Sequence, residues 1–359
     1  MTEAPAPRAN PDLLGHAVAE RAFLDAWESG RLAHAWLITG PKGIGKATLA
    51  YRIARFVLAG GGGGGGLFGG PASLALPEDA PVFRRVAAAG HADLKVATRG
   101  WSDDKKTRLR TEIVVDDVRG IGGFLALTPA EGGWRVVVID AAEEMNRNAA
   151  NAVLKVLEEP PRNALMLLVS HSPGRLLPTI RSRCRRLALS PLPETTVADL
   201  LRRWQPDLGP DDVAALARLA EGSIGKALGL AAEGGLGLYR DLVGLLQTLP
   251  RLDVPALHAF ADRVGRADAD AAWRTLTELF GWWLARLIQA GGRQGEGMAE
   301  VVPGEGAVMA RLLAAGGLDR WLEVWEKVTS LFARTDAVNL ERKQALLTAF
   351  LAVERLARA

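Results

Sequence analysis

The sequence of 359 residues contains a single cysteine, Cys184, and no apolar run of 18 or more residues. One cysteine excludes an internal disulfide bond and any zinc site built from several cysteines. The missing apolar run argues against a membrane-spanning helix, and the first residues lack the apolar core of a signal peptide. We therefore expect a cytoplasmic protein without membrane association. The net charge of only +3 mildly favours an anionic partner and does not require one.

What the sequence does contain is typical of a globular protein with more than one domain. Its length allows two or three domains, and 48% hydrophobic with 24% charged residues can form buried cores. We expect an α/β domain over 12–190, a small helical lid domain over 191–235 and an all-helical domain over 236–359. The glycine-rich run at 60–70 predicts a flexible loop, to which we assign no function.

Residues 134–186 hold the central pattern of the first domain. The β-branched run 135–140 and the apolar run 164–169 each predict a strand buried on both faces. Between them, apolar residues recur at helical spacing over 149–157. A strand, a helix and a strand in this order predict a parallel βαβ unit with a right-handed crossover.

The two predicted strands end in polar residues, Asp140 and Ser170. In parallel sheets, ligands collect at the carboxyl ends of the strands. We therefore expect the functional site at this edge of the sheet.

A third predicted strand, 35–39, leads into a glycine-rich loop and then a helix, which is the context of a P-loop. Glycines let backbone N–H groups surround a phosphate, and the lysine adds positive charge. The nucleotide-binding candidates here are Gly40, Lys42, Gly43, Gly45, Lys46 and Thr48. Ala47 occupies the place of the Ser or Thr that holds Mg²⁺, and Thr48 comes one residue late. The sequence thus predicts a phosphate loop without its metal ligand, with an ordinary glycine turn as the alternative.

Three segments carry a resemblance to a known family. They are HAWLITGPKGIGKATLA (34–50), FLALTPAEGGWRVVVIDAAEEMNRNAANAVLKVLEEPP (124–161) and LPTIRSRCRRL (177–187). With them the sequence resembles clamp-loader subunits of the AAA+ class, and among these the delta-prime subunits of bacterial DNA polymerase III of the alphaproteobacterial kind. The resemblance covers about 13–190, weakens towards 235, and rests on helical architecture beyond.

The resemblance makes Asp140 the Walker B aspartate, which orients Mg²⁺ in relatives that hydrolyse ATP. In those relatives a glutamate follows, whereas this chain has Ala141, and Glu143 and Glu144 lie too far on to replace it. Loss of a general base costs roughly 10²–10⁴-fold in rate. Ala47 and Ala141 together imply a subunit that does not hydrolyse ATP.

The resemblance also implies roles for three further residues. Arg183 matches the arginine finger that reaches the ATP of an adjacent subunit; a surface basic patch is the alternative. Ser170 matches the sensor-1 position, and Lys226 matches sensor 2, where ATPases of the family usually carry Arg. An ordinary strand-end serine and a solvated helix lysine remain the alternatives for these two.

Glu158 and Glu159 stand at the C-terminal end of the predicted central helix, where they oppose the helix macrodipole. Each costs about 0.3–1 kcal/mol in that position. We therefore expect a cationic group nearby, from this chain or a neighbour; an exposed helix end is the alternative.

The implied function is that of a stator in the clamp-loader complex of the DNA polymerase III holoenzyme. Its expected partners are the ATPase and delta subunits, the sliding clamp and, through the complex, primed DNA. A hetero-oligomer would form through a collar made by the C-terminal helices. No cofactor is expected to be required: ATP binding would be weak, and zinc absent, because the cysteines that bind it in many relatives are missing and His34, His91 and His171 are scattered. The alternatives are an ATP-hydrolysing loader subunit and an unrelated P-loop enzyme such as a nucleotide kinase.

Overall fold

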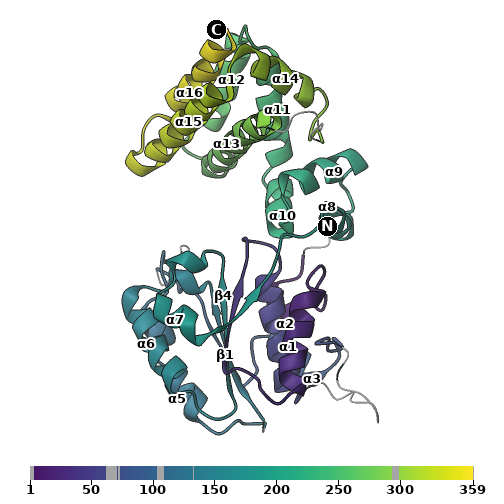
Figure 1. The fold of residues 1–359 in the computed structure, drawn as a ribbon, viewed down its shortest axis with the longest axis vertical. Coiled ribbons are helices and arrows are strands. Elements are labelled where there is room, and N and C mark those ends of the chain that lie inside the picture. The colour runs from purple at the N-terminus through teal and green to yellow at the C-terminus, as the bar shows by residue number, and fades with distance from the viewer. Residues whose placement is uncertain are drawn as a thin grey trace. The chain divides into compact units, whose positions relative to one another are not determined.

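A computed structural model describes residues 4–61, 71, 73–102, 109–131, 133–292 and 299–358. The chain forms two compact units (Figure 1). The first contains the chain to Pro206 together with Glu221–Gly225, and the second contains Asp207–Ala220 and the chain from Lys226 onwards. The division into domains at 190 and 235 stays a prediction. Most of the predicted glycine-rich loop at 60–70 lies outside the described residues.

The first unit is built on a parallel sheet of five strands in the order β2-β3-β4-β1-β5. The strands are β1 (Ala35–Thr39), β2 (Leu94–Ala97), β3 (Arg135–Asp140), β4 (Ala164–Ser170) and β5 (Arg185–Ala188). Strands β3 and β4 are adjacent and parallel, which confirms the predicted βαβ unit.

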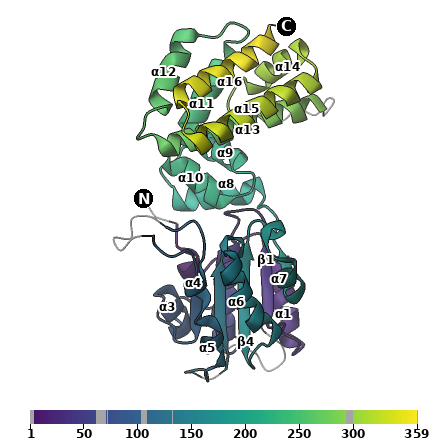
Figure 2. The ribbon, with the colours of Figure 1, turned by 90° about the vertical axis from the view of Figure 1, so that its left-hand side faces the viewer.

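Helices cover both faces of this sheet (Figure 1). One face carries α1 (Ala17–Glu28), α2 (Lys46–Leu58) and α3 (Pro81–Ala87), and the other carries α4 (Val115–Val118), α5 (Ile121–Ala126), α6 (Arg147–Glu158) and α7 (Pro178–Arg183). Figure 2 shows α5 and α6 in front of the strands. Strand β3 alternates between the two cores: Val136 and Val138 pack on the α1–α2 side, and Val137 and Ile139 pack on the α6 side. Burial on both faces explains why this strand reads as a continuous apolar run.

One predicted helix is wrong. The sequence places Asp116 as a plausible N-cap before an apolar stretch and so predicts a single helix through about 127, whereas the chain forms the two short helices α4 and α5. The Asp117 carboxylate accepts a hydrogen bond from the backbone N–H of Val114 (2.9 Å), which makes Val114 the N-cap residue. Gly120 separates the two helices, consistent with the low helix propensity of glycine.

Among its described residues the second unit contains helices joined by turns and no strand, as the sequence predicts. Helix α8 (Glu194–Trp204) belongs to the first unit, and α10 (Ile224–Ala232) begins there. The remaining helices are α9 (Pro210–Leu219), α11 (Gly235–Gln247), α12 (Val254–Val264), α13 (Asp270–Gly292), α14 (Glu305–Ala315), α15 (Leu318–Val338) and α16 (Arg342–Ala357). Their core centres on aromatic contacts, with the Phe280 ring 4.9 Å from Phe350 and 5.9 Å from Phe332. Within the described ranges, none of the helices is both long enough and apolar enough to cross a membrane.

Candidate functional site

The phosphate loop runs from the end of β1 to the start of α2, as predicted. Gly40 (φ +145°) and Gly43 (φ +78°) have backbone conformations that side chains rarely adopt. A Cβ on Gly40 would lie 2.4 Å from the Leu189 carbonyl oxygen, and one on Gly43 would lie 2.4 Å from Ser223 Oγ. These two glycines are therefore required by close packing of the loop against residues 189 and 223.

The carbonyl groups of residues 42–44 in this loop each accept a hydrogen bond within the first unit. Ser223 Oγ donates to the Lys42 carbonyl (2.8 Å), the Gly225 N–H donates to Gly43 (2.9 Å), and His16 Nε2 donates to Ile44 (2.6 Å). By contrast, the backbone N–H groups of residues 42–47 donate to no acceptor in the described part of the chain. The loop is thus fixed through its carbonyls and keeps its N–H groups available for an anion.

The pocket beside this loop is small. It measures about 40 Å³, and Leu13, Gly45, Thr48, Leu192 and Ile224 are among the side chains and backbone atoms that line it. Pockets for small molecules usually measure about 300–1,000 Å³. This pocket, as the structure has it, is too small to enclose a nucleoside. Thr48 faces this pocket and is mostly buried.

Lys46 is buried, and its ammonium group donates to the Pro41 carbonyl of the loop itself. Burial lowers the pKa of Lys46 from 10.5 to about 8, although the negative charges of Glu143 and Asp140 oppose this shift. The lysine that should meet a phosphate is held by its own loop.

This pKa makes stability depend on pH. Because the folded-state pKa of Lys46 lies below the unfolded value, the unfolded chain binds the extra proton between about pH 8 and 10.5. The free energy of unfolding should therefore rise across this window by about 1–3 kcal/mol relative to a Lys46→Met variant. Urea unfolding of both proteins at several pH values measures the difference, and parallel curves would contradict the shifted pKa.

Of the acidic residues at and after the end of β3, Glu143 and Glu144 are bonded to other parts of the chain. Burial raises the pKa of the Asp140 carboxyl, against the opposing charge of Lys46. Glu143 accepts hydrogen bonds from the backbone N–H groups of His171 (2.7 Å) and Ser172 (3.1 Å). Although burial opposes it, this bonding lowers the pKa of Glu143. Glu144 pairs with Arg99 at 2.8 Å.

Sequence reasoning missed the role of Glu143. It connects the segment after β3 to the exit of β4, and its position three residues beyond Asp140 gives no signal of that contact. Ala141, buried directly after Asp140, offers no carboxylate at that position, and Glu143 Oε2 is buried without a hydrogen-bond partner among the described residues.

The two sensor candidates lie in different units. Ser170 is fully buried at the end of β4 and pairs in register with Thr39 of β1, next to the phosphate loop. Lys226 belongs to the second unit, where its Nζ lies 6.0 Å from the centre of the Trp282 ring. The structure therefore brings Ser170, Asp140 and Lys46 to one edge of the sheet, and the nucleotide contact of Lys226 stays a prediction.

Arg183, the last residue of α7, lies beside Glu158, the last residue of α6. Its Nη2 is 2.8 Å from Glu158 Oε1, and its Nη1 donates to the Thr179 carbonyl (3.1 Å). The prediction of a cation near Glu158 and Glu159 is confirmed, and the cation comes from this chain. The pair connects the segments 157–161 (LEEPP) and 182–184 (SRC).

The neighbouring basic residues have other surroundings. Arg185 stacks on Trp36 with 4.7 Å between guanidinium and ring centre, and Arg186 Nε donates to Thr39 Oγ1 (3.2 Å). Burial raises the pKa of the Cys184 thiol to about 11, so it stays protonated and packs as a small apolar group. Among the described residues, no group of His, Cys, Asp or Glu could hold a metal ion.

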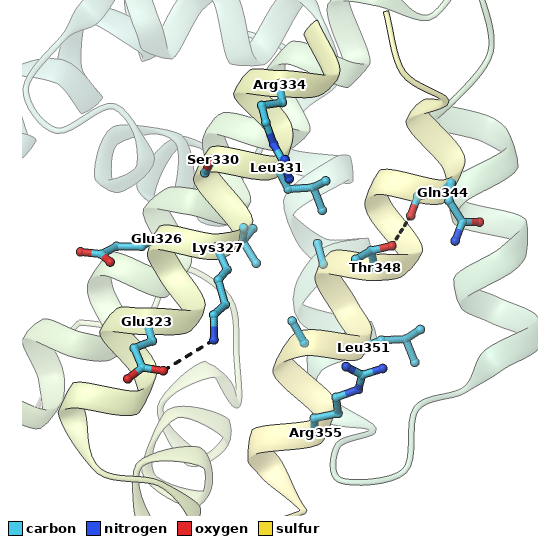
Figure 3. Close-up of a pocket in the computed structure, with 13 residues that line it drawn as sticks. Glu323, Glu326, Lys327, Ser330, Leu331, Arg334, Gln344, Thr348, Leu351 and Arg355 are labelled. Atoms are coloured by element: carbon cyan, nitrogen blue, oxygen red, sulfur yellow. Dashed lines mark hydrogen bonds and ion pairs between the residues drawn. The ribbon is translucent and has the colours of Figure 1, made fainter. Parts of the chain in front are cut away.

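A groove of about 960 Å³ lies in the second unit between α15 and α16 (Figure 3). Its walls carry charges of both signs, with Glu323 paired to Lys327 (3.6 Å), Arg334 further along α15 and Arg355 on α16. The lining residues include neither histidine nor cysteine, and their mixed charge selects no ligand. We assign this groove no chemistry.

The sheet order and the phosphate loop define the class of protein. Strand β1 lies between β4 and β5 and leads into the phosphate loop. Strand β3 lies on the other side of β4 and ends in an acidic residue. With a helical region following the α/β domain, this is the AAA+ fold.

Comparison with known sequences gives the family. The sequence model of the family described as "DNA polymerase III, delta subunit" matches residues 15–193, about half of the chain, and over these residues the chain belongs to that family. DNA polymerase III subunit delta' of Pseudomonas aeruginosa is 38% identical over 192 residues, covering 53% of both chains. The subunit of the same name from Escherichia coli is 33% identical over 205 residues, covering 57% of this chain and 56% of the relative. DNA polymerase III subunit gamma of Buchnera aphidicola is 26% identical over 259 residues, covering 71% and 66%. The chain thus spans about half the length of the delta' relatives it matches.

Proposed function

We propose that this protein is a non-hydrolysing stator subunit of the DNA polymerase III clamp loader. In this role it helps to place the sliding clamp on primed DNA in the cytoplasm and donates Arg183 to the ATP site of a neighbouring subunit. Its partners are the ATPase and delta subunits, and its C-terminal helices join the collar of the complex. The resemblance to subunits named delta' supports the setting, and the altered nucleotide site supports the role.

The observation that carries the proposal is that the phosphate loop and the acidic end of β3 lack the groups that hydrolysis needs. A hydrolytic site needs a hydroxyl to hold Mg²⁺ and a carboxylate to activate water. Ala47 and Ala141 supply neither, Glu143 Oε1 accepts hydrogen bonds from the exit of β4, and Glu144 pairs with Arg99. Lys46 donates to its own loop, and the adjacent pocket measures only about 40 Å³. These features favour weak ATP binding, no hydrolysis in this chain and no required cofactor.

The experiment is a phosphate-release assay on the isolated full chain, together with titration of a fluorescent ATP analogue. We expect no turnover above that of a Lys46→Ala variant, because both proteins lack the catalytic parts. We also expect binding no tighter than about millimolar, since the phosphate loop alone contributes. Turnover that Lys46→Ala abolishes would instead favour the alternative, an ATP-hydrolysing loader subunit, and turnover that depends on a small phosphoryl acceptor would favour a nucleotide kinase.

A further inference from the structure

The guanidinium of Arg183 has two partners within its own chain and keeps donors to spare. Of its five N–H groups, one faces Glu158 Oε1 and one is donated to the Thr179 carbonyl. The remaining three have no acceptor in the described part of the chain. The side chain can therefore stay bound to Glu158 while it presents donors to another molecule.

Glu158 differs in this respect from the acidic residue that follows it. Both stand at the C-terminal end of α6, where a negative charge is unfavourable. Glu159 is exposed and forms no side-chain hydrogen bond or ion pair among the described residues, whereas Glu158 is bonded to Arg183. The two residues thus have the same charge and stand at the same end of the helix, and they differ in that only Glu158 contacts Arg183.

A long arginine side chain samples many rotamers unless something fixes its end. Its guanidinium stabilises charge on a transferring phosphoryl group only from a defined position. The Thr179 carbonyl of α7 accepts from Nη1 of the Arg183 guanidinium, and the Glu158 carboxylate of α6 lies beside its Nη2. These two contacts fix the guanidinium.

We propose that Glu158 is a positioning residue for Arg183, which holds the guanidinium ready for the ATP of a neighbouring subunit. The inference rests on the proposed function, since it takes Arg183 to be the arginine finger. Glu158 itself touches no phosphate. Because the side chains of Arg183 and Glu158 are 35% and 50% exposed, solvent screens the pair and its effect is moderate.

The test is ATP hydrolysis by the reconstituted clamp loader that contains the full chain. We expect Glu158→Gln to lower kcat at the site that Arg183 completes by about two- to fivefold, the effect of one exposed ion pair. The KM for ATP should not change, because the arginine acts on charge that develops in the transition state. The matched control is Glu159→Gln, which removes the same charge from the same helix end and should leave kcat unchanged.

A double variant separates positioning from a general structural effect. In the Arg183→Ala background, Glu158→Gln should have no further effect on kcat, because the two residues act as one unit. Equal kcat for Glu158→Gln and Glu159→Gln, or a faster Glu158→Gln enzyme, would overturn the positioning role while the stator function stands. If Arg183→Ala itself leaves hydrolysis unchanged, the arginine finger is wrong, and the positioning role is overturned with it.

Discussion

Replacing Arg183 by alanine should lower ATP hydrolysis by about 10³–10⁵-fold at the site that this chain completes in the reconstituted loader. Guanidinium stabilises the charge that spreads over the transferring phosphoryl oxygens, and no other group supplies its planar set of donors. The structure places Arg183 at the end of α7 with three donors unused. Single-turnover phosphate release from the assembled complex measures the effect.

Two matched variants distinguish an arginine finger from a basic surface patch. Arg183→Lys keeps the charge and loses the planar set of donors, so most of the activity should still be lost. Arg181→Ala removes an exposed arginine of the same short helix, which forms no side-chain hydrogen bond or ion pair among the described residues, and should retain nearly full activity. Equal losses for the variants at 181 and 183 would instead indicate a basic surface patch that acts through its summed charge.

The strands could be predicted because local sequence determined them. Strand β3 reads as a β-branched run that ends at a carboxylate, and the structure begins and ends it at the predicted residues. The helix after it has its apolar face at regular spacing, and prolines follow its end. In such segments propensity, periodicity and termination agree, so tertiary packing has little left to decide.

The prediction of one helix in place of α4 and α5 failed for a local reason that the apolar pattern does not reveal. Spacing favoured one helix through 127, but Asp117 caps the N–H of Val114 and Gly120 separates the two helices. Asp117 acts from the third position of α4 on the N–H of Val114, so Val114 and not Asp116 is the N-cap, which periodicity does not show.

Within the site, sequence reasoning gave the residue types and missed their partners. The absent hydroxyl at Ala47 and the absent carboxylate at Ala141 can be read directly from the spacing. The bond from Lys46 to the Pro41 carbonyl and the contacts of Glu143 with the exit of β4 depend on how loops fold back. One long-range contact did have a signal: two acids at a helix end predict a cation, and Arg183 supplies it.

Replacing Glu305 by alanine should destabilise the second unit by about 3–5 kcal/mol. The Glu305 carboxylate is buried, and it accepts hydrogen bonds from the Tyr239 hydroxyl and the Val301 N–H (2.8 Å). Arg286, itself mostly buried, approaches it to 3.4 Å. Burial, with the nearby Glu305 charge, raises the pKa of Tyr239, so the hydroxyl stays protonated as a donor. Removing the carboxylate leaves a buried hydroxyl, a backbone N–H and a guanidinium without their acceptor.

Urea unfolding followed by circular dichroism measures this loss, with Glu323→Ala as the matched control. Glu323 also pairs with a basic residue, Lys327, but both side chains are largely exposed, so the change should stay within about 0.5 kcal/mol. A cost for Glu305→Ala as small as that of the control would mean that the buried cluster relaxes or admits water. In that case the charges around Tyr239 would not fix the segment 299–305, and the helices of this unit would be stabilised by apolar packing alone.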